Sequence, residues 1–113
     1  AAFADTIDGS KRVVCTTESL RDCVAGADCL NGVPAEYGAP TSLRLDFANK
    51  QVLGEKRKSK IRDLEKKDGQ LLLQGREMGY GWTIAIEQKS GDMTLSLVNR
   101  EDAFLLFGRC AAI

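Results

Sequence analysis

Four cysteines carry the most predictable chemistry in this sequence. Cys15, Cys23, Cys29 and Cys110 allow three pairings into two disulfides, and an even count in a chain of 113 residues is typical of exported domains. A metal site is the alternative, but the spacing contains no C-x-x-C pair and the chain contains no histidine. We therefore expect two disulfides, no metal site and no cofactor.

The absence of histidine also limits catalysis. It excludes Ser-His-Asp and Cys-His nucleophiles and histidine general bases. Paired carboxylates remain at Glu101 with Asp102 and at Asp63 with Glu65, on a turn and on a charged strand. Nothing in their spacing places two of them across a cleft. We expect the protein not to be an enzyme.

A basic run follows in the middle of the chain, where seven of the 16 lysines and arginines fall between positions 56 and 67. One interpretation is a face that binds an anion or an acidic partner. The other, more common, is a solvated edge hairpin whose lysines block strand addition. Aromatic residues are not interleaved with the run, so we expect no nucleic-acid binding. The candidate binding residues are Lys56, Arg57, Lys58, Lys60 and Arg62.

Glycines and aromatic residues lie close together further along the chain. Gly75, Gly79 and Gly81 do not have the spacing of a phosphate-binding loop, and a strand rather than a helix follows them, so we predict a hairpin turn. Tyr37 and Tyr80 lie on predicted loops, where amphipathic aromatic side chains are suited to contact a partner.

Trp82 is the only tryptophan, and two interpretations of it are open. We favour the simpler one, that the indole fills the core. The alternative is that the sheet encloses a hollow for a small apolar ligand. In that case we expect the lining to include Trp82, Ile84, Leu95 and Phe104.

The elements that position these residues are predicted to be strands. Residues 1–42 have an irregular pattern, with one strand over 12–17 and a capping-box motif that predicts a short helix over 19–24. From Leu43 onward apolar residues recur at every second position, with turn signals every eight to twelve residues. The run 58–65 is out of phase by one residue, which predicts a bulge.

This pattern predicts an all-β fold. We expect a single domain over residues 5–113, with an antiparallel meander of about eight strands over 43–110 and an irregular disulfide-bonded N-terminal segment. Closure as a small lipocalin-like barrel would remove the two exposed edges. Cys15 would then bond Cys110 across the seam between the first and last strands, and Cys23 would bond Cys29. The strand over 103–107, apolar on both faces, is expected to be the most enclosed.

The first residues of the chain also indicate where in the cell the protein is located. Ala2-Phe3-Ala4 has the small-x-small pattern that precedes a signal-peptidase cut, so residues 1–4 are interpreted as a signal-peptide remnant. Together with paired cysteines, this predicts a periplasmic or secreted protein. No apolar run approaches the roughly 18 residues of a membrane span, so we expect no transmembrane segment.

Several stretches of residues 43–110 carry a resemblance. They are a tryptophan strand at Gly81–Ile86, a G-x-M-T-L turn at Gly91–Leu95 and an A-F-x-x-F-G-x-C terminus at Ala103–Cys110. On these stretches the chain resembles a group of small exported bacterial β-domain proteins of uncharacterised function. The resemblance implies export and a compact disulfide-bonded β domain, and it implies no site residues. The architecture is also similar to small-barrel periplasmic lysozyme inhibitors, although their Ser-Gly-x-x-Tyr loop has no counterpart here.

Two functions are compatible with these observations. The first is an exported, non-catalytic binding module that recognises a protein or envelope component through Tyr37, Tyr80 and the basic run. The alternative is a carrier of a small apolar ligand inside the barrel. Internal volume distinguishes the two, because a solid core would eliminate the carrier and a cavity of about 300 Å³ or more would favour it.

Overall fold

The computed structural model describes residues 7–113, and all its regular structure except one turn of 3₁₀ helix is β-strand. The predicted signal-peptide remnant at residues 1–4 lies outside the described residues. The 3₁₀ helix is η1 (Pro34–Tyr37). The strands are β1 (Val13–Val24), β2 (Leu30–Gly32), β3 (Ser42–Asp46), β4 (Gln51–Leu53), β5 (Lys58–Lys60), β6 (Asp63–Lys67), β7 (Gln70–Glu77), β8 (Tyr80–Glu87), β9 (Asp92–Val98) and β10 (Asp102–Ala112).

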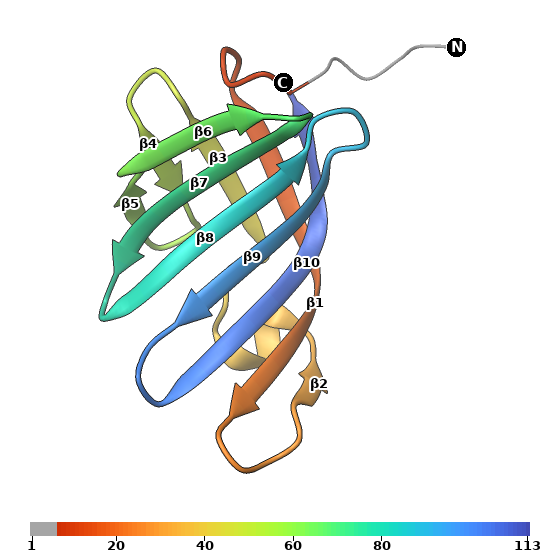
Figure 1. The fold of residues 1–113 in the computed structure, drawn as a ribbon, viewed down its shortest axis with the longest axis vertical. Coiled ribbons are helices and arrows are strands. Elements are labelled where there is room, and N and C mark those ends of the chain that lie inside the picture. The colour runs from red at the N-terminus through yellow and green to blue at the C-terminus, as the bar shows by residue number, and fades with distance from the viewer. Residues whose placement is uncertain (1–6) are drawn as a thin grey trace.

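The strands form one antiparallel sheet in the order β5-β4-β3-β1-β10-β9-β8-β7-β6, with β2 paired to the far half of β1. This confirms the all-β class and the antiparallel meander. The sheet curls into a half-barrel (Figure 1). The expected closed cylinder is not completed by a continuous ladder of hydrogen bonds, because β5 and β6 each pair with a single neighbouring strand.

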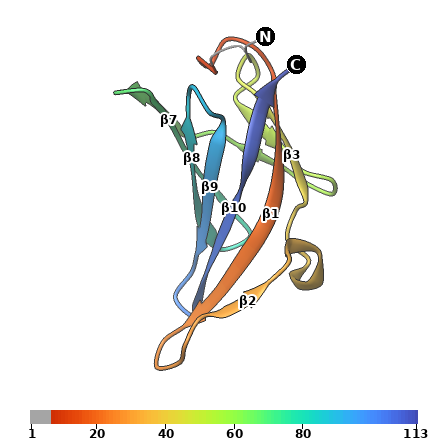
Figure 2. The ribbon, with the colours of Figure 1, turned by 90° about the vertical axis from the view of Figure 1, so that its right-hand side faces the viewer.

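The first and last long strands meet as predicted. β1 and β10 lie side by side along their length (Figure 2), and Cys15 is the register partner of Cys110. The Cys15–Cys110 and Cys23–Cys29 disulfides are both present, which confirms the predicted connectivity. The break in the ladder is therefore not at this seam but between β5 and β6.

The chain crosses that break in a single bend at Ile61 and Arg62. The Ile61 N–H donates to the Lys50 carbonyl at 2.8 Å on one side, and the Arg62 N–H donates to the Gln74 carbonyl at 2.8 Å on the other. The bulge predicted in the run 58–65 is wrong, because the run is two strands, β5 and β6, and its change of phase marks the bend where the chain changes partner strands. Its first half pairs with β4 and its second half pairs with β7.

Two local predictions are wrong. Residues 19–24 do not form a helix but continue β1, since they pair with β10 on one side and partly with β2 on the other. These ladders override a weak capping signal. The strand over 103–107 is not fully enclosed, because Leu105 is 36% and Phe107 is 40% exposed whereas Leu106 is buried. The convex face of β10 has no second layer to cover it.

The tight turns have the expected residues. Asp68 and Gly69 both have positive φ between β6 and β7, and Met78 and Gly79 do so between β7 and β8. Two positive φ angles in a two-residue connection match the twist of a β-hairpin. The glycines around position 79 therefore form a hairpin, as predicted.

Candidate functional site

The concave face of the half-barrel lines a cavity of about 630 Å³ that is open to solvent. Because side chains alternate between the two faces of a strand, β8, β9 and β10 direct one apolar set inward. The apolar wall consists of Leu43, Val52, Trp82, Ile84, Leu95, Leu97 and Phe104. All four residues predicted for a ligand cavity, Trp82, Ile84, Leu95 and Phe104, lie in this wall.

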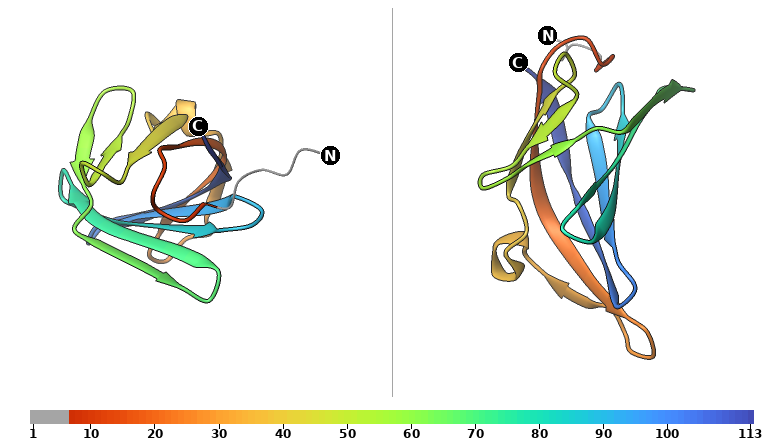
Figure 3. Two further views of the ribbon diagram at one scale, coloured as in Figure 1. Left: turned by 90° about the horizontal axis from the view of Figure 1, so that it is seen from above. Right: turned by 90° about the vertical axis from the view of Figure 1, so that its left-hand side faces the viewer.

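Only one end of the half-barrel is hollow. At the other end, Ile7 is 3% exposed and belongs to the same core cluster as Leu71 and Ile86. The Ile7 N–H donates to the Gln88 carbonyl at 3.1 Å, and the Gln88 side-chain amide donates back to the Ile7 carbonyl at 2.6 Å. Seen from above, the segment before β1 lies across the interior (Figure 3). The cavity therefore lies at the opposite end, which we call the mouth.

Three aromatic rings gather at the mouth. The ring centroid of Phe104 lies 6.2 Å from that of Tyr37 and 6.2 Å from that of Tyr80. The Tyr80 hydroxyl donates to an Asp102 carboxylate oxygen at 3.3 Å. Burial, and then the neighbouring Asp102 charge, raise the pKa of Tyr80 above its ordinary value. Tyr80 thus stays a neutral donor, and the two tyrosines flank the apolar wall as an amphipathic rim.

Local backbone structure places Tyr37 in this group. η1 begins at Pro34, which suits the first turn of a helix, and ends at Gly38, whose φ of 68° is left-handed. A Cβ on Gly32 would come within 2.3 Å of the Tyr37 ring, so the ring packs directly on the backbone of β2. The predicted loop positions are wrong for both tyrosines, because Tyr37 is the last residue of η1 and Tyr80 is the first residue of β8, and both line the cavity.

Lys56, Arg57 and Lys58 form the opposite part of the rim, and we call them the basic turn. All three are exposed and line the mouth where the chain turns between β4 and β5. The preceding residue holds this turn in place. One Glu55 carboxylate oxygen accepts hydrogen bonds from the Thr41 hydroxyl at 2.7 Å, the Thr41 N–H at 2.8 Å and the Ser42 N–H at 3.1 Å.

Glu55 makes this part of the rim sensitive to acid. The Thr41 hydrogen bonds, followed by that of Ser42, lower the pKa of Glu55 below its ordinary value. A lowered folded pKa contributes stability that is full above the unfolded pKa and is lost as the pH falls through the folded pKa. We expect Glu55→Gln to flatten the decline in unfolding free energy below about pH 5, measured by urea denaturation at several pH values. Glu65→Gln, on exposed β6, should keep the wild-type decline, and equal slopes for both variants would contradict the prediction.

Trp82 lines the cavity and also connects strands across the break in the half-barrel. Its indole N–H donates to the Ser59 hydroxyl at 2.8 Å, and that hydroxyl donates to the Arg76 carbonyl at 3.1 Å. The ring lies over Gly75, where a Cβ would come within 2.3 Å of it. A chain of side-chain hydrogen bonds therefore joins β5 to β7 and β8 where no strand ladder does.

Removing the Ser59 hydroxyl leaves the buried indole N–H of Trp82 without its acceptor. We expect Ser59→Ala to lower the free energy of unfolding by about 1–3 kcal/mol, measured by urea denaturation. Ser96→Ala, on the convex face of β9, is the matched control and should change it by less than about 0.5 kcal/mol. A Ser59→Ala variant as stable as this control would show that the hydrogen-bonded connection is unimportant.

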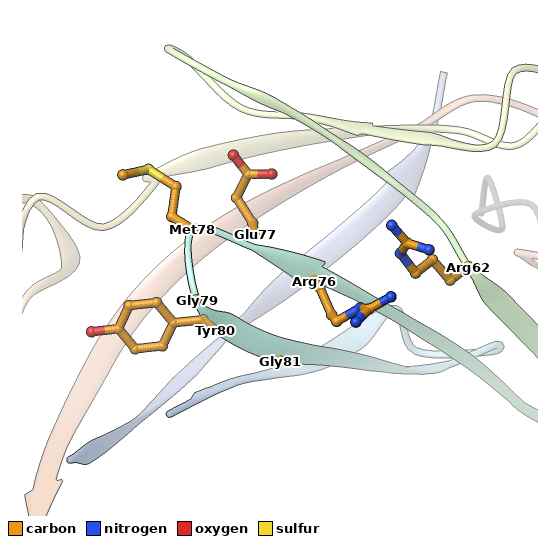
Figure 4. Close-up of a pocket in the computed structure, with 7 residues that line it drawn as sticks. All are labelled: Arg62, Arg76, Glu77, Met78, Gly79, Tyr80 and Gly81. Atoms are coloured by element: carbon orange, nitrogen blue, oxygen red, sulfur yellow. The ribbon is translucent and has the colours of Figure 1, made fainter. Parts of the chain in front are cut away.

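The structure does not bring the whole basic run to one place. Lys60 is exposed and does not line the cavity. Arg62 lines a separate, shallow hollow of about 500 Å³ beside the β7–β8 hairpin, together with Arg76. Figure 4 shows both arginine side chains on one side of this hollow, with Tyr80 pointing away from them. The bend at Ile61 and Arg62 separates Arg62 from the basic turn, whereas Lys60 lies on the same strand as Lys58.

Several lining residues were not predicted from the sequence, notably Leu43, Val52, Leu97 and Met78. The signal for Leu97 was present, because it continues the alternation of Met93 and Leu95 by two positions. Met78 is 67% exposed at the tip of the β7–β8 hairpin, and no sequence pattern indicated its place at the mouth.

Groups suited to metal binding or disulfide exchange are not found. Among residues 7–113, no cluster of three or more cysteine, aspartate or glutamate side chains is arranged to hold a metal ion, and no cysteine is free. The predicted carboxylate pairs lie on exposed β6 and at the start of β10. Within this described range no helix has the length and apolar character needed to cross a membrane.

Comparison of the chain with protein-family models, curated proteins and solved structures finds no match. The resemblance to small exported β-domain proteins therefore stays a prediction. Function has to be inferred from the cavity and its rim.

Proposed function

We propose that this protein is a non-catalytic carrier that binds a small apolar molecule in the cavity of its half-barrel. The observation that supports this proposal is the volume of about 630 Å³ behind an apolar wall. Ligand pockets have volumes of about 300–1,000 Å³ and are lined mainly by apolar and aromatic side chains. The alternative function from the sequence thereby gains support. Trp82 is also a core residue, as favoured from the sequence, because it is 5% exposed and belongs to the core cluster as well as lining the cavity.

The other prediction, a module that binds a protein or an envelope component, remains untested. Its contact residues Tyr37, Tyr80 and Lys56 all line the mouth of the cavity. Both roles would therefore use the same residues at the mouth. For this reason we place the ligand-binding proposal first.

We also propose that the protein acts outside the cytoplasm, in the periplasm or as a secreted protein. Both disulfides indicate an oxidising environment. Such a location is compatible with carrying apolar molecules between compartments.

Titration with N-phenylnaphthylamine, a neutral dye that fluoresces in apolar surroundings, tests the binding proposal. We expect saturable binding with one site per chain, accompanied by a change in the fluorescence of Trp82, the only tryptophan and a wall residue. A non-saturable signal, or saturation without any response from Trp82, would contradict binding in this cavity.

A further inference from the structure

We propose that the ligand is an amphipathic anion, with an acyl chain in the cavity and an anionic head group at the basic turn. This inference rests on the proposed function and specifies the chemical class of the ligand. It follows from three features of the cavity: an apolar wall, a single open end and a rim rich in cations.

The apolar depth of the cavity offers no polar group that is free to recognise a ligand. Ile84 is 1% and Leu95 is 4% exposed, and both present only carbon atoms. The Trp82 indole N–H is already used by Ser59, whose own hydrogen is donated to the Arg76 carbonyl. A polar ligand group placed there would lose its hydration without gaining a partner, so an acyl chain fits this region and a head group does not.

The closed end sets the direction of the ligand. Ile7, with the core side chains around it, fills the interior beyond Ile84. The ligand must therefore enter with its acyl chain first and leave its polar head group at the mouth. A ligand with polar groups at both ends is excluded, since one of them would have to be buried against apolar side chains.

The rim favours a negative head group. Lys56, Arg57 and Lys58 are exposed there, and none of them makes an ion pair with another of the residues that the structure describes. Glu55 and Glu77 also line the cavity, but the three cations outnumber them. Glu55 stays ionised, because hydrogen bonds from Thr41 and Ser42 stabilise its carboxylate, so the three cations and two carboxylates of the lining leave a net charge of +1. Unpaired cations beside an apolar opening attract a carboxylate or another acyl anion.

Competition against N-phenylnaphthylamine tests this inference with three ligands of equal chain length: dodecanoate, dodecanol and dodecyltrimethylammonium. At low ionic strength we expect dodecanoate to bind about tenfold or more tightly than the ammonium, with dodecanol between them, since each exposed cation contributes up to about 1 kcal/mol. The preference should shrink as salt is added.

Two charge-matched variants complete the experiment. Combined replacement of Lys56, Arg57 and Lys58 by alanine should remove the preference for dodecanoate over dodecyltrimethylammonium, so that the two bind within about twofold of each other. Combined replacement of Lys60, Lys66 and Lys67, which do not line the cavity, removes the same charge and should keep the preference.

The outcomes separate the two proposals. Equal binding of the anion and the cation by the wild type, or loss of the preference in both variants, would overturn the anionic head group and leave the carrier intact. Failure of all three ligands, dodecanol included, to displace the dye would overturn the carrier itself.

Discussion

Replacing Leu97 by tryptophan is expected to weaken the binding of N-phenylnaphthylamine by about 100-fold or more, which corresponds to about 2.7 kcal/mol. Leu97 is the register partner of Trp82 on one side and of Phe104 on the other, in the middle of the cavity wall. A second indole at this position would occupy the space that the ligand needs. Isothermal titration calorimetry is the appropriate measurement, because the added tryptophan complicates fluorescence.

The neighbouring residue supplies the control for this variant. The side chain of Ser96 points away from the cavity, because side chains alternate along β9 and Leu97 points inward. Its register partners Thr83 and Leu105 lie on the same convex face. Ser96→Trp therefore adds the same side chain outside the cavity and should bind the dye within about twofold of the wild type. Equal loss of binding in both variants would place the dye outside the cavity.

The second large effect concerns the seam between β1 and β10. We expect the double replacement Cys15→Ala with Cys110→Ala to lower the free energy of unfolding by about 4–5 kcal/mol. The bridge spans 95 residues, so it restricts the unfolded chain strongly. A loss of this size is comparable to the whole stability of a marginal small domain. Guanidinium denaturation followed by circular dichroism measures it.

The other disulfide is the comparison. Cys23 and Cys29 are separated by only 6 residues, so Cys23→Ala with Cys29→Ala should lower the free energy of unfolding by about 2 kcal/mol. If the two double variants were equally destabilised, or if the Cys15 variant lost less than the Cys23 variant, loop closure would not explain how these bridges stabilise the fold.

Much of the fold was predictable because its signals are local. Alternating apolar residues and the turn at Asp68-Gly69 determine strands and hairpins over a few positions. The disulfide connectivity followed from one topological step, which placed Cys15 on the first strand and Cys110 on the last. These signals needed no knowledge of the three-dimensional packing.

The wrong predictions concern segments whose structure or burial depends on tertiary packing. The segment 19–24 has a weak helix signal, but it lies between two strands that supply its hydrogen bonds. Leu105 and Phe107 resemble core residues in sequence, yet no second layer covers their side of β10. A local pattern shows that a side chain is apolar, and it does not show whether anything packs on it.

The candidate site was predictable only in part for the same reason. Trp82, Ile84, Leu95 and Phe104 were identifiable as one inward-facing set from their alternation. Whether that set encloses a filled core or a cavity depends on the curvature of the whole sheet. Likewise, the basic run is continuous in sequence, and the bend at Ile61 directs its second half, from Arg62 onward, to the other side of the break in the sheet.

A crystal structure of the protein grown with dodecanoate tests the central claim most directly. We predict electron density for the acyl chain between Trp82 and Phe104, with the carboxylate at the basic turn. Density for dodecanoate only on the convex face, or an interior in which side chains leave no room for the chain, would contradict this account.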